Sequence, residues 1–329
     1  MSSAGGIGFV VIGRNEGGRL GLCLQSVLRQ SDRVVYADSR STDGSVELAK
    51  SLGVTVTDVE GEPLTAARGR NAGFGALKRT WPDVEFVQFV DGDCIIAPSW
   101  VSTAADFLAS NEKAAVACGR RREAHPGASF YNQVIDREWD TPVGKAEACG
   151  GDALVRVEAF EAVDGFRSEL VAGEEPDFCA RLRANGWQIW RLDAPMTEHD
   201  AAIHNAGQWM RRAMRSGFGY AQVRKSTGLY DRELKSALGW AVAVPLLALL
   251  IAVLAGDARV LLLIPAAYLV QVVRIAARGG LTAYAWKYAL LVMGAKAGEA
   301  IGIFRYLFAA RSTQAFQYKP VQQAGRPVA

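Results

Sequence analysis

The sequence has few cysteines and few histidines, which limits the kinds of site that it can carry. Five cysteines are scattered over 329 residues without paired spacing, and there are three histidines. An odd number of unpaired cysteines indicates a reducing compartment and argues against a zinc site. The formal net charge of +3 is small, so the composition does not indicate a nucleic-acid partner.

Two phosphate-binding loops and an N-terminal export signal are also missing. The sequence contains no Gly-x-Gly-x-x-Gly segment and no Gly-Lys-Ser/Thr segment, so it does not indicate a dinucleotide-binding or P-loop fold. Residues 1–8 lack the basic start of a secretory signal peptide and lead directly into a strand-like run. We therefore expect the N-terminal part of the chain to stay in the cytoplasm.

Charge is missing from a long run near the C-terminus. Residues 237–255 contain no charged side chain and are mostly Ala, Val and Leu. A helix of that length rises about 28 Å, close to the thickness of bilayer hydrocarbon, which predicts a membrane span. The second uncharged run, 260–273, is short and is expected to span or to re-enter. Charges interrupt the apolar stretch 284–310, which is more typical of an interfacial or packed helix.

Basic residues flank these apolar runs. Seven arginines and lysines lie between residues 211 and 235, two arginines follow the second run, and the loop between the runs carries only Arg259. The positive-inside rule then places both flanks in the cytoplasm. We expect a protein of the inner (cytoplasmic) membrane whose large domain faces the cytoplasm and whose basic segment contacts anionic lipid.

Apolar runs alternate with helix-like segments over the first 110 residues. The expected strands are 7–12, 34–37, 54–59 and 86–90, and the expected helices are 20–29, 45–52, 65–78 and 100–110. This alternation predicts an α/β domain with a Rossmann-like, mostly parallel sheet and helices on both faces. In such sheets, ligands bind beyond the carboxyl ends of the strands.

Polar residues follow three of the expected strands at that edge. They are Asn15 and Glu16 after the first strand, Asp38 at the end of the second, and Asp91 and Asp93 after the fourth. An Asp-x-Asp pair at the end of a buried strand offers oxygen ligands with which Mg²⁺ or Mn²⁺ can bridge to a diphosphate. Each cluster taken alone is also typical of a turn or a helix cap.

Taken in order, these motifs resemble the inverting glycosyltransferases of family 2, which have the GT-A fold. The resemblance covers residues 7–220, and the segments that carry it are Val10–Glu16, Ala37–Ser45, Ala67–Gly73 and Asp91-Gly92-Asp93. It implies a GT-A domain that uses a nucleotide sugar as donor and a divalent metal, Mn²⁺ or Mg²⁺, as cofactor, with Asp91-Gly92-Asp93 as its DXD motif.

The same resemblance implies roles for individual residues. The nucleotide sugar would be bound by Asn15, Glu16, Asp38, Arg70, Asn71, Asp91, Gly151 and Asp152, and the metal by Asp93, Asp91 and His199. Simpler interpretations remain open. Arg70 and Asn71 also fit a solvated helix face, Asp152 fits a turn or cap, and a single histidine is more often structural.

A further acidic segment begins an expected helix. In Gly173-Glu174-Glu175-Pro176-Asp177, the residue that corresponds to the family's base is Glu175, with Glu174 and Asp177 as alternatives. A base is needed because a sugar hydroxyl is a poor nucleophile until a carboxylate takes its proton. Acidic residues and a proline in a first helical turn also suit an ordinary helix N-terminus.

These observations predict four segments and one activity. The segments are a GT-A catalytic domain (1–205), a basic juxtamembrane segment (206–236), hydrophobic C-terminal helices (237–310) and a polar tail (311–329). The expected activity is transfer of a single sugar from a UDP-sugar to a polyprenyl-diphosphate-linked oligosaccharide in cell-envelope or exopolysaccharide synthesis. Alternatives are a polyprenyl-phosphate glycosyltransferase and a catalytically silent GT-A-like membrane scaffold. The sequence does not indicate an oligomeric state.

Overall fold

The computed structural model describes residues 6–309, which fall into two compact units. Unit 1 contains the described residues up to His125 together with Ile135–Ala201, and unit 2 contains Pro126–Val134 and residues 202–309. The expected polar tail, 311–329, lies outside the described residues, as does the last residue of the hydrophobic segment.

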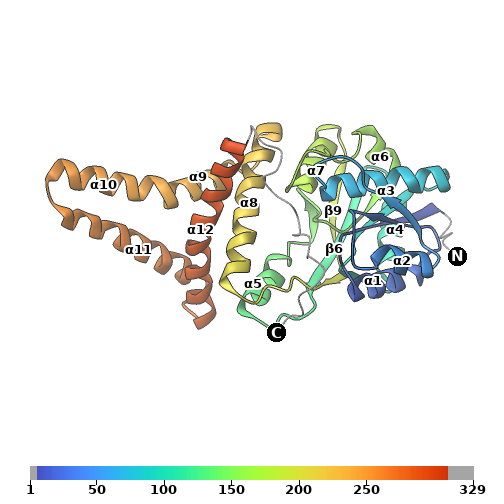
Figure 1. The fold of residues 1–329 in the computed structure, drawn as a ribbon, viewed down its shortest axis with the longest axis horizontal. Coiled ribbons are helices and arrows are strands. Elements are labelled where there is room, and N and C mark those ends of the chain that lie inside the picture. Colours follow the sequence, from blue (N-terminus) through green and yellow to red (C-terminus); the bar gives the residue numbers. More distant parts are fainter. Residues whose placement is uncertain (1–5, 310–329) are drawn as a thin grey trace. The chain divides into compact units, whose positions relative to one another are not determined.

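Unit 1 is built on one sheet with helices on both faces (Figure 1). Its strands are β1 Ile7–Gly13, β2 Val34–Asp38, β3 Thr55–Asp58, β4 Phe86–Asp91, β5 Cys94–Ile96, β6 Ala114–Glu123, β7 Gly144–Ala146, β8 Ala153–Arg156 and β9 Gln188–His199. Its helices are α1 Gly18–Leu28, α2 Ser45–Ser51, α3 Ala66–Thr80, α4 Trp100–Ser110, α6 Val157–Ala162 and α7 Glu174–Ala184, while α5 Phe130–Glu138 is divided between the units.

The sheet has the strand order β3-β2-β1-β4-β8-β6-β9-β5, with β7 paired to β9. Pairing is parallel across β3, β2, β1 and β4 and between β6 and β9, and antiparallel for β4/β8, β6/β8, β5/β9 and β7/β9. The expected α/β class is confirmed, but the sheet is mixed rather than mostly parallel. The strand-helix alternation that predicts parallel pairing stops after residue 110, and β8 enters between β4 and β6 in the opposite direction.

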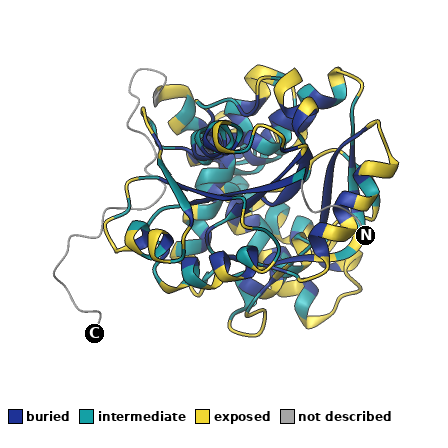
Figure 2. Cartoon of the chain, turned by 90° about the vertical axis from the view of Figure 1, so that its right-hand side faces the viewer, coloured by how far each residue is buried: buried dark blue, intermediate teal, exposed yellow. Residues whose placement is uncertain are grey.

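The core of unit 1 explains why the central strands form where they do. Phe9, Val11 and Phe89 are at most 1% exposed, and the strands lie in dark blue between the helices in Figure 2. Full burial of each such side chain contributes roughly 1.5 to 3 kcal/mol, so strands that are apolar on both faces are stable only when covered on both.

This register brings the polar clusters of three strands to one edge. Gly13 at the end of β1 lies opposite Asp38 of β2, and Ile12 lies opposite Asp91 of β4. Residues that are far apart in the sequence therefore meet beyond the same carboxyl ends, where ligands of such sheets bind.

Unit 2 is helical. It contains α8 Ala206–Thr227, α9 Asp231–Leu238, the π-helical turn η2 Gly239–Ala243, α10 Val244–Ala255, the 3₁₀ turn η3 Ala258–Leu262, α11 Leu263–Arg278 and α12 Ala283–Ala309.

Two continuous helices, Asp231–Ala255 with 25 residues and Ala258–Arg278 with 21, are long and apolar enough to cross a membrane by length and composition. Large apolar side chains such as Leu254 and Val270 are exposed along them. The expected C-terminal apolar helices are thus confirmed, and the second is longer than the run 260–273.

Helix α12 packs along α8. The two backbones are in contact, because a Cβ atom on Gly217 would overlap the carbonyl oxygen of Glu299, and one on Gly302 would overlap that of Met214. Glycine at a helix crossing allows this close approach. Two of the charges that interrupt the apolar stretch are paired, since Lys296 Nζ lies 2.8 Å from Glu299 Oε2.

Candidate active site

Asn15 connects the loops after β1 and β2, and Asp38 stabilises the second of them. Asn15 Oδ1 accepts a hydrogen bond from the backbone of Thr42 at 2.7 Å, and Asp38 Oδ2 accepts one from the backbone of Ser41 at 2.8 Å. The buried Asp38 also accepts a 2.8 Å hydrogen bond from Tyr36 Oη at Oδ1. Asn15 and Asp38 therefore shape this edge of the sheet, and their roles toward a nucleotide stay predictions.

Arg19 links the first polar cluster to the Asp-x-Asp motif. Its guanidinium lies 2.8 Å from the buried Glu16 carboxylate and 3.9 Å from Asp93 Oδ2, and its side chain is 37% exposed. Arg19 was not among the site residues predicted from the sequence. Its position three residues after Glu16, where α1 begins, is the signal that could have found it, because such pairs lie on one helix face.

Asp93 and His199 are close enough to bind one metal ion, and Cys94 lies beside them. Strand β5 runs antiparallel to β9, which sets Cys94 opposite His199 and brings His199 Nε2 to 3.3 Å from Asp93 Oδ1. Two ligands at right angles on one octahedral ion, each about 2.1 Å away, lie about 3 Å apart. Among residues 6–309, the buried His199 Nδ1 has no hydrogen-bond partner. The donor set fits a divalent cation.

The charge on Asp93 also suits a cation. Burial alone would raise its pKa, but the hydrogen bond from His199 and the positive charges of Arg121 and Arg19 outweigh burial and hold the pKa well below its usual range. Asp93 is therefore a carboxylate at neutral pH and is ready to bind a metal without first losing a proton.

Asp91 is held differently from Asp93. Arg70 Nη2 lies 3.0 Å from Asp91 Oδ1, and Arg121 Nη2 lies 3.2 Å from Asp91 Oδ2. Burial would raise the pKa of Asp91, and the two arginines together lower it below the usual value. Because both oxygens bind guanidinium groups, the geometry favours Asp93 and His199 over Asp91 as cation ligands, and metal binding by Asp91 stays a prediction.

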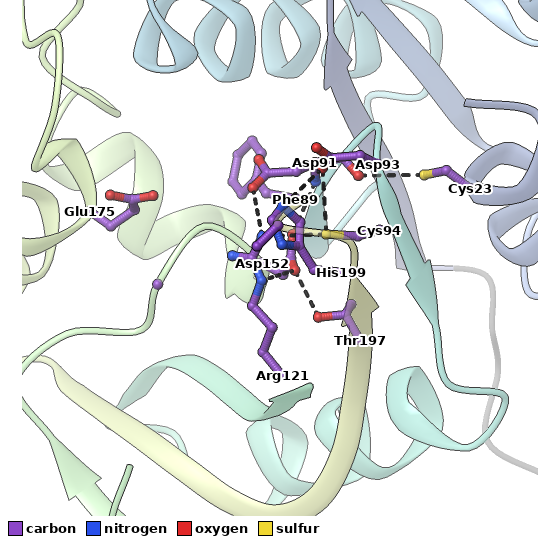
Figure 3. A network of polar contacts seen from close by, with 12 residues as sticks. Cys23, Phe89, Asp91, Asp93, Cys94, Arg121, Asp152, Glu175, Thr197 and His199 are labelled. Carbon is purple, nitrogen blue, oxygen red and sulfur yellow. Dashed lines mark hydrogen bonds and ion pairs between the residues drawn. The ribbon is translucent and has the colours of Figure 1, made fainter. Parts of the chain in front are cut away.

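Arg121 and Asp152 lie close to Asp91 of the Asp-x-Asp motif (Figure 3), and Arg121 forms ion pairs with both carboxylates. Arg121 Nε lies 3.6 Å from Asp152 Oδ2, and its guanidinium stacks 4.8 Å from the Trp139 ring. Asp152 is fully buried, accepts a 2.8 Å hydrogen bond from Thr197 Oγ1, and accepts another at 3.0 Å from the backbone of Asp91. Asp152 thus fixes the backbone of the motif, and its contact with the donor sugar stays a prediction.

Replacing Arg121 with alanine is expected to lower the free energy of unfolding by about 3 kcal/mol, because it leaves the buried Asp152 without its cation and removes one of the two cations that hold Asp91. Chemical denaturation of the full chain in detergent, followed by tryptophan fluorescence, measures this. The matched control is Arg122→Ala, since Arg122 is the exposed neighbour on the same strand. Equal free energies of unfolding for the two variants would contradict the role of Arg121 in stabilising the buried carboxylates.

Arg70 joins the motif to the start of α7. It is 1% exposed, so the solvated helix position that the sequence left open is wrong. Its Nη1 donates a 2.8 Å hydrogen bond to Glu174 Oε1, and its Nη2 lies 3.5 Å from Glu175 Oε1 as well as beside Asp91. One guanidinium therefore connects the metal motif to both of these glutamates.

Glu175 has the properties of a base near neutral pH. Burial and the adjacent negative charge of Glu174 raise its pKa to about 7, although the positive charge of Arg70 acts in the opposite direction. Figure 3 shows its carboxylate set apart from the Asp91 and Asp93 network. The Arg70 guanidinium lies between the Glu175 carboxylate and Asp91, at 3.5 Å and 3.0 Å respectively.

Asp177 and Asn71, two other predicted site residues, contact the segment between α6 and α7. Asp177 is fully buried and lies between Arg167 at 3.2 Å and Arg181 at 2.9 Å, so it is not brought together with Arg70. Asn71 accepts a 3.0 Å hydrogen bond from the backbone N–H of Phe166 and donates a 2.7 Å one to the carbonyl oxygen of the same residue. Both residues hold the segment between α6 and α7, and their roles in catalysis and nucleotide binding stay predictions.

Gly151 touches the motif directly. A Cβ atom there would lie 2.8 Å from Asp91 Oδ2 and 3.0 Å from Arg70 Nη2, closer than such atoms approach. The backbone of this loop can therefore rest against the charged cluster only when residue 151 has no side chain.

Substituting Gly151 with alanine is expected to raise the KM for the nucleotide sugar about tenfold, because the added methyl displaces Asp91 or the loop by part of an ångström. Steady-state kinetics with varied donor concentration measure the effect. The control is Gly127→Ala, where a Cβ atom meets open space. An unchanged KM in Gly151→Ala would show that the loop does not line the donor.

Comparison with known proteins gives the following similarities. A family model described as Glycosyl transferase family 2 matches residues 9–162. The Succinoglycan biosynthesis protein ExoA of Rhizobium meliloti (strain 1021) is 27% identical in an alignment of 218 residues that covers 61% of this chain and 62% of that protein. The match therefore spans less than two thirds of the length of that relative.

A solved structure extends the likeness to most of the chain. The Mannosyltransferase PcManGT from Pyrobaculum calidifontis in complex with GDP-Man and Mn²⁺ superposes with a TM-score of 0.61 at 17% identity, over 92% of this chain and 87% of that one. At this identity the likeness shows the fold, which confirms the GT-A architecture expected from the sequence.

Proposed function

We propose, from the premise that residues 9–162 of this chain belong to glycosyl transferase family 2, that it is an inverting glycosyltransferase. It moves a single sugar from a nucleotide sugar to a lipid-linked acceptor at a membrane. The observation that carries the proposal is the contact of one buried guanidinium, that of Arg70, with Asp91 on one side and Glu175 on the other. The Asp-x-Asp motif and the proton-accepting group are thereby linked through one side chain.

The donor side of the site contains the candidate metal ligands. Asp93 and His199 would hold Mn²⁺ or Mg²⁺, which neutralises charge on a leaving diphosphate when bound. The structurally similar mannosyltransferase holds GDP-Man and Mn²⁺, which supports a nucleotide sugar and a divalent metal here. Because Arg70 is buried among carboxylates, we assign the diphosphate contact to Arg19, the partly exposed cation beside Asp93.

Glu175 accepts the proton in this proposal. The acceptor hydroxyl oxygen forms a bond to the anomeric carbon, its proton passes to the Glu175 carboxylate, and the bond to the diphosphate breaks. A single displacement of this kind inverts the anomeric carbon. Glu174 keeps Arg70 in place through its 2.8 Å hydrogen bond and is a positioning residue.

The acceptor is assigned from the membrane helices and from the relative. The helices Asp231–Ala255 and Ala258–Arg278 expose apolar side chains that lipid would cover, and the relative acts in succinoglycan biosynthesis. We infer that the acceptor is a polyprenyl-diphosphate-linked oligosaccharide for exopolysaccharide synthesis, with the catalytic unit on the cytoplasmic side of the inner membrane. Basic residues of α8 would contact anionic lipid.

An assay with two lipids tests this function. The full chain in lipid nanodiscs is incubated with Mn²⁺, a panel of UDP- and GDP-sugars, and either a polyprenyl-diphosphate-linked oligosaccharide or a polyprenyl monophosphate. We expect transfer to the first lipid from one donor. Transfer only to the monophosphate would replace our acceptor by the alternative one. Failure to release nucleoside diphosphate with every donor and both lipids would favour a silent scaffold.

A further inference from the structure

Two thiols that the proposed reaction does not use lie in contact beside the site. Cys149 Sγ and Cys179 Sγ are 3.6 Å apart, and both cysteines are free. They come from segments 30 residues apart in the sequence, the loop between β7 and β8 and the middle of α7. Such a pair is unexpected for a chain whose cysteine spacing indicates no pairing.

Both segments carry residues of the candidate site. Cys149 stands two residues before Gly151, which touches Asp91 and Arg70, while α7 carries Glu174 and Glu175 at its first turn. The loop already rests on α7 through a hydrogen bond from Arg183 to the carbonyl oxygen of Glu147. A covalent link between the two sulfurs would therefore join the loop to the helix of the base.

The two thiols are not equivalent. Cys149 is partly exposed, whereas Cys179 is buried. Cys179 donates a hydrogen bond to Cys149 Sγ, and this bond and burial raise the pKa of Cys179 well above its usual value. An oxidant from solvent reaches Cys149 first, and Cys179 is kept as a neutral thiol next to it.

We propose that Cys149 and Cys179 form a modification site at which a peroxide converts the dithiol to a disulfide. The Cys149 thiolate attacks a peroxide oxygen, the O–O bond breaks and one water leaves after protonation, which gives a sulfenic acid. The Cys179 sulfur then attacks the Cys149 sulfur, a second water leaves and the S–S bond forms. Two thiols lose two electrons and two protons, and one hydrogen peroxide becomes two waters.

The disulfide changes the geometry of the site. A disulfide holds its sulfurs about 2.05 Å apart, so the pair must close by about 1.5 Å. Helix α7 is held by the ion pair of Asp177 with Arg167 and by the hydrogen bond from Arg181 to the carbonyl oxygen of Gly165, whereas the loop contains Gly150 with a φ of +78°. The loop therefore moves toward α7 and carries Gly151 away from Asp91. This consequence rests on the proposed function, and the bond itself does not.

Peptide mapping tests the bond without any activity measurement. The reduced full chain in detergent is treated with hydrogen peroxide, remaining thiols are alkylated, and non-reducing digestion is followed by mass spectrometry. We expect a peptide pair linked through Cys149 and Cys179, which disappears with dithiothreitol. Over-oxidation of Cys149 without a link, or a link to Cys118 instead, would overturn the proposal.

Activity and matched variants test the consequence. Peroxide is expected to lower kcat/KM for sugar transfer at least tenfold, dithiothreitol to restore it, and Cys149→Ser and Cys179→Ser to abolish the response. Cys118→Ala is the control, because Cys118 is buried and its thiol donates a hydrogen bond to the carbonyl oxygen of Trp190. A mapped disulfide with unchanged transfer would refute the effect on the site. A mapped disulfide in a chain that is inactive with every donor would refute the proposed function alone.

Discussion

Glu175→Gln is expected to lower kcat for sugar transfer about a thousandfold, since general bases contribute roughly 10²- to 10⁴-fold and an amide cannot accept the proton. The substitution keeps the shape of the side chain, so the KM for the donor should change little. Single-turnover transfer at saturating donor and acceptor measures the loss. Glu158→Gln, at an exposed position on α6, is the control and should retain full activity. A Glu175→Gln enzyme within tenfold of the parent would assign the base elsewhere.

The pH profile gives the same prediction an independent readout. Because the pKa of Glu175 is raised to about 7, its carboxyl is protonated and inactive below that pH, and kcat should rise as the pH increases through 7. Removing the negative charge of Glu174 with Glu174→Gln lowers the pKa of Glu175, so the rise should move to lower pH. A profile that stays flat between pH 5 and 9 in the parent enzyme would be incompatible with Glu175 as the base.

Asp93→Asn is expected to lower kcat/KM about a thousandfold, or roughly 4 kcal/mol, and to remove the stimulation by Mn²⁺. The reason is that Asp93 is the carboxylate that faces His199 and keeps its negative charge at neutral pH. Nucleoside diphosphate release over a Mn²⁺ titration measures activity, and electron paramagnetic resonance of added Mn²⁺ measures binding directly.

The control for Asp93 is Asp83→Asn, because the Asp83 side chain is 64% exposed and pairs with Arg33 on the surface. This variant should keep both the activity and the Mn²⁺ dependence of the parent. Metal-independent release that survives in Asp93→Asn would remove the metal from the reaction. Intact Mn²⁺ binding with lost activity would move the cation to other ligands.

Local pattern was enough to predict the first half of unit 1. The expected helix 100–110 is α4 with the same bounds, and the expected strand 7–12 is β1 with one residue added. These elements are regular because their apolar periodicity, their lengths and their neighbours all favour the same structure. The edge where Asp38 and Asp91 meet follows from parallel order, which the alternation of strands and helices already predicts.

The local sequence pattern could not predict contacts between segments that are far apart in the sequence. Arg121 stands in a run of three arginines on β6, and only the pairing of β6 with β8 and β9 turns this particular one toward Asp152. Arg70 is the buried charge of its helix, on which Arg68 and Lys78 are partly exposed and Arg79 is exposed, and its burial depends on α7, about a hundred residues later. Charge spacing along a single segment contains no information about such partners.

The contact between α8 and α12 also makes the C-terminal unit recognisable in other chains. Gly298 and Gly302 are four residues apart and lie on the face of α12 that meets α8, and a methyl group at position 302 would overlap the opposite backbone. A homologue that keeps this helix crossing is expected to keep glycine at the position of Gly302 and a small residue four positions earlier, even where overall identity is low. That short signature can therefore separate chains that carry the whole assembly from those that share only the catalytic unit.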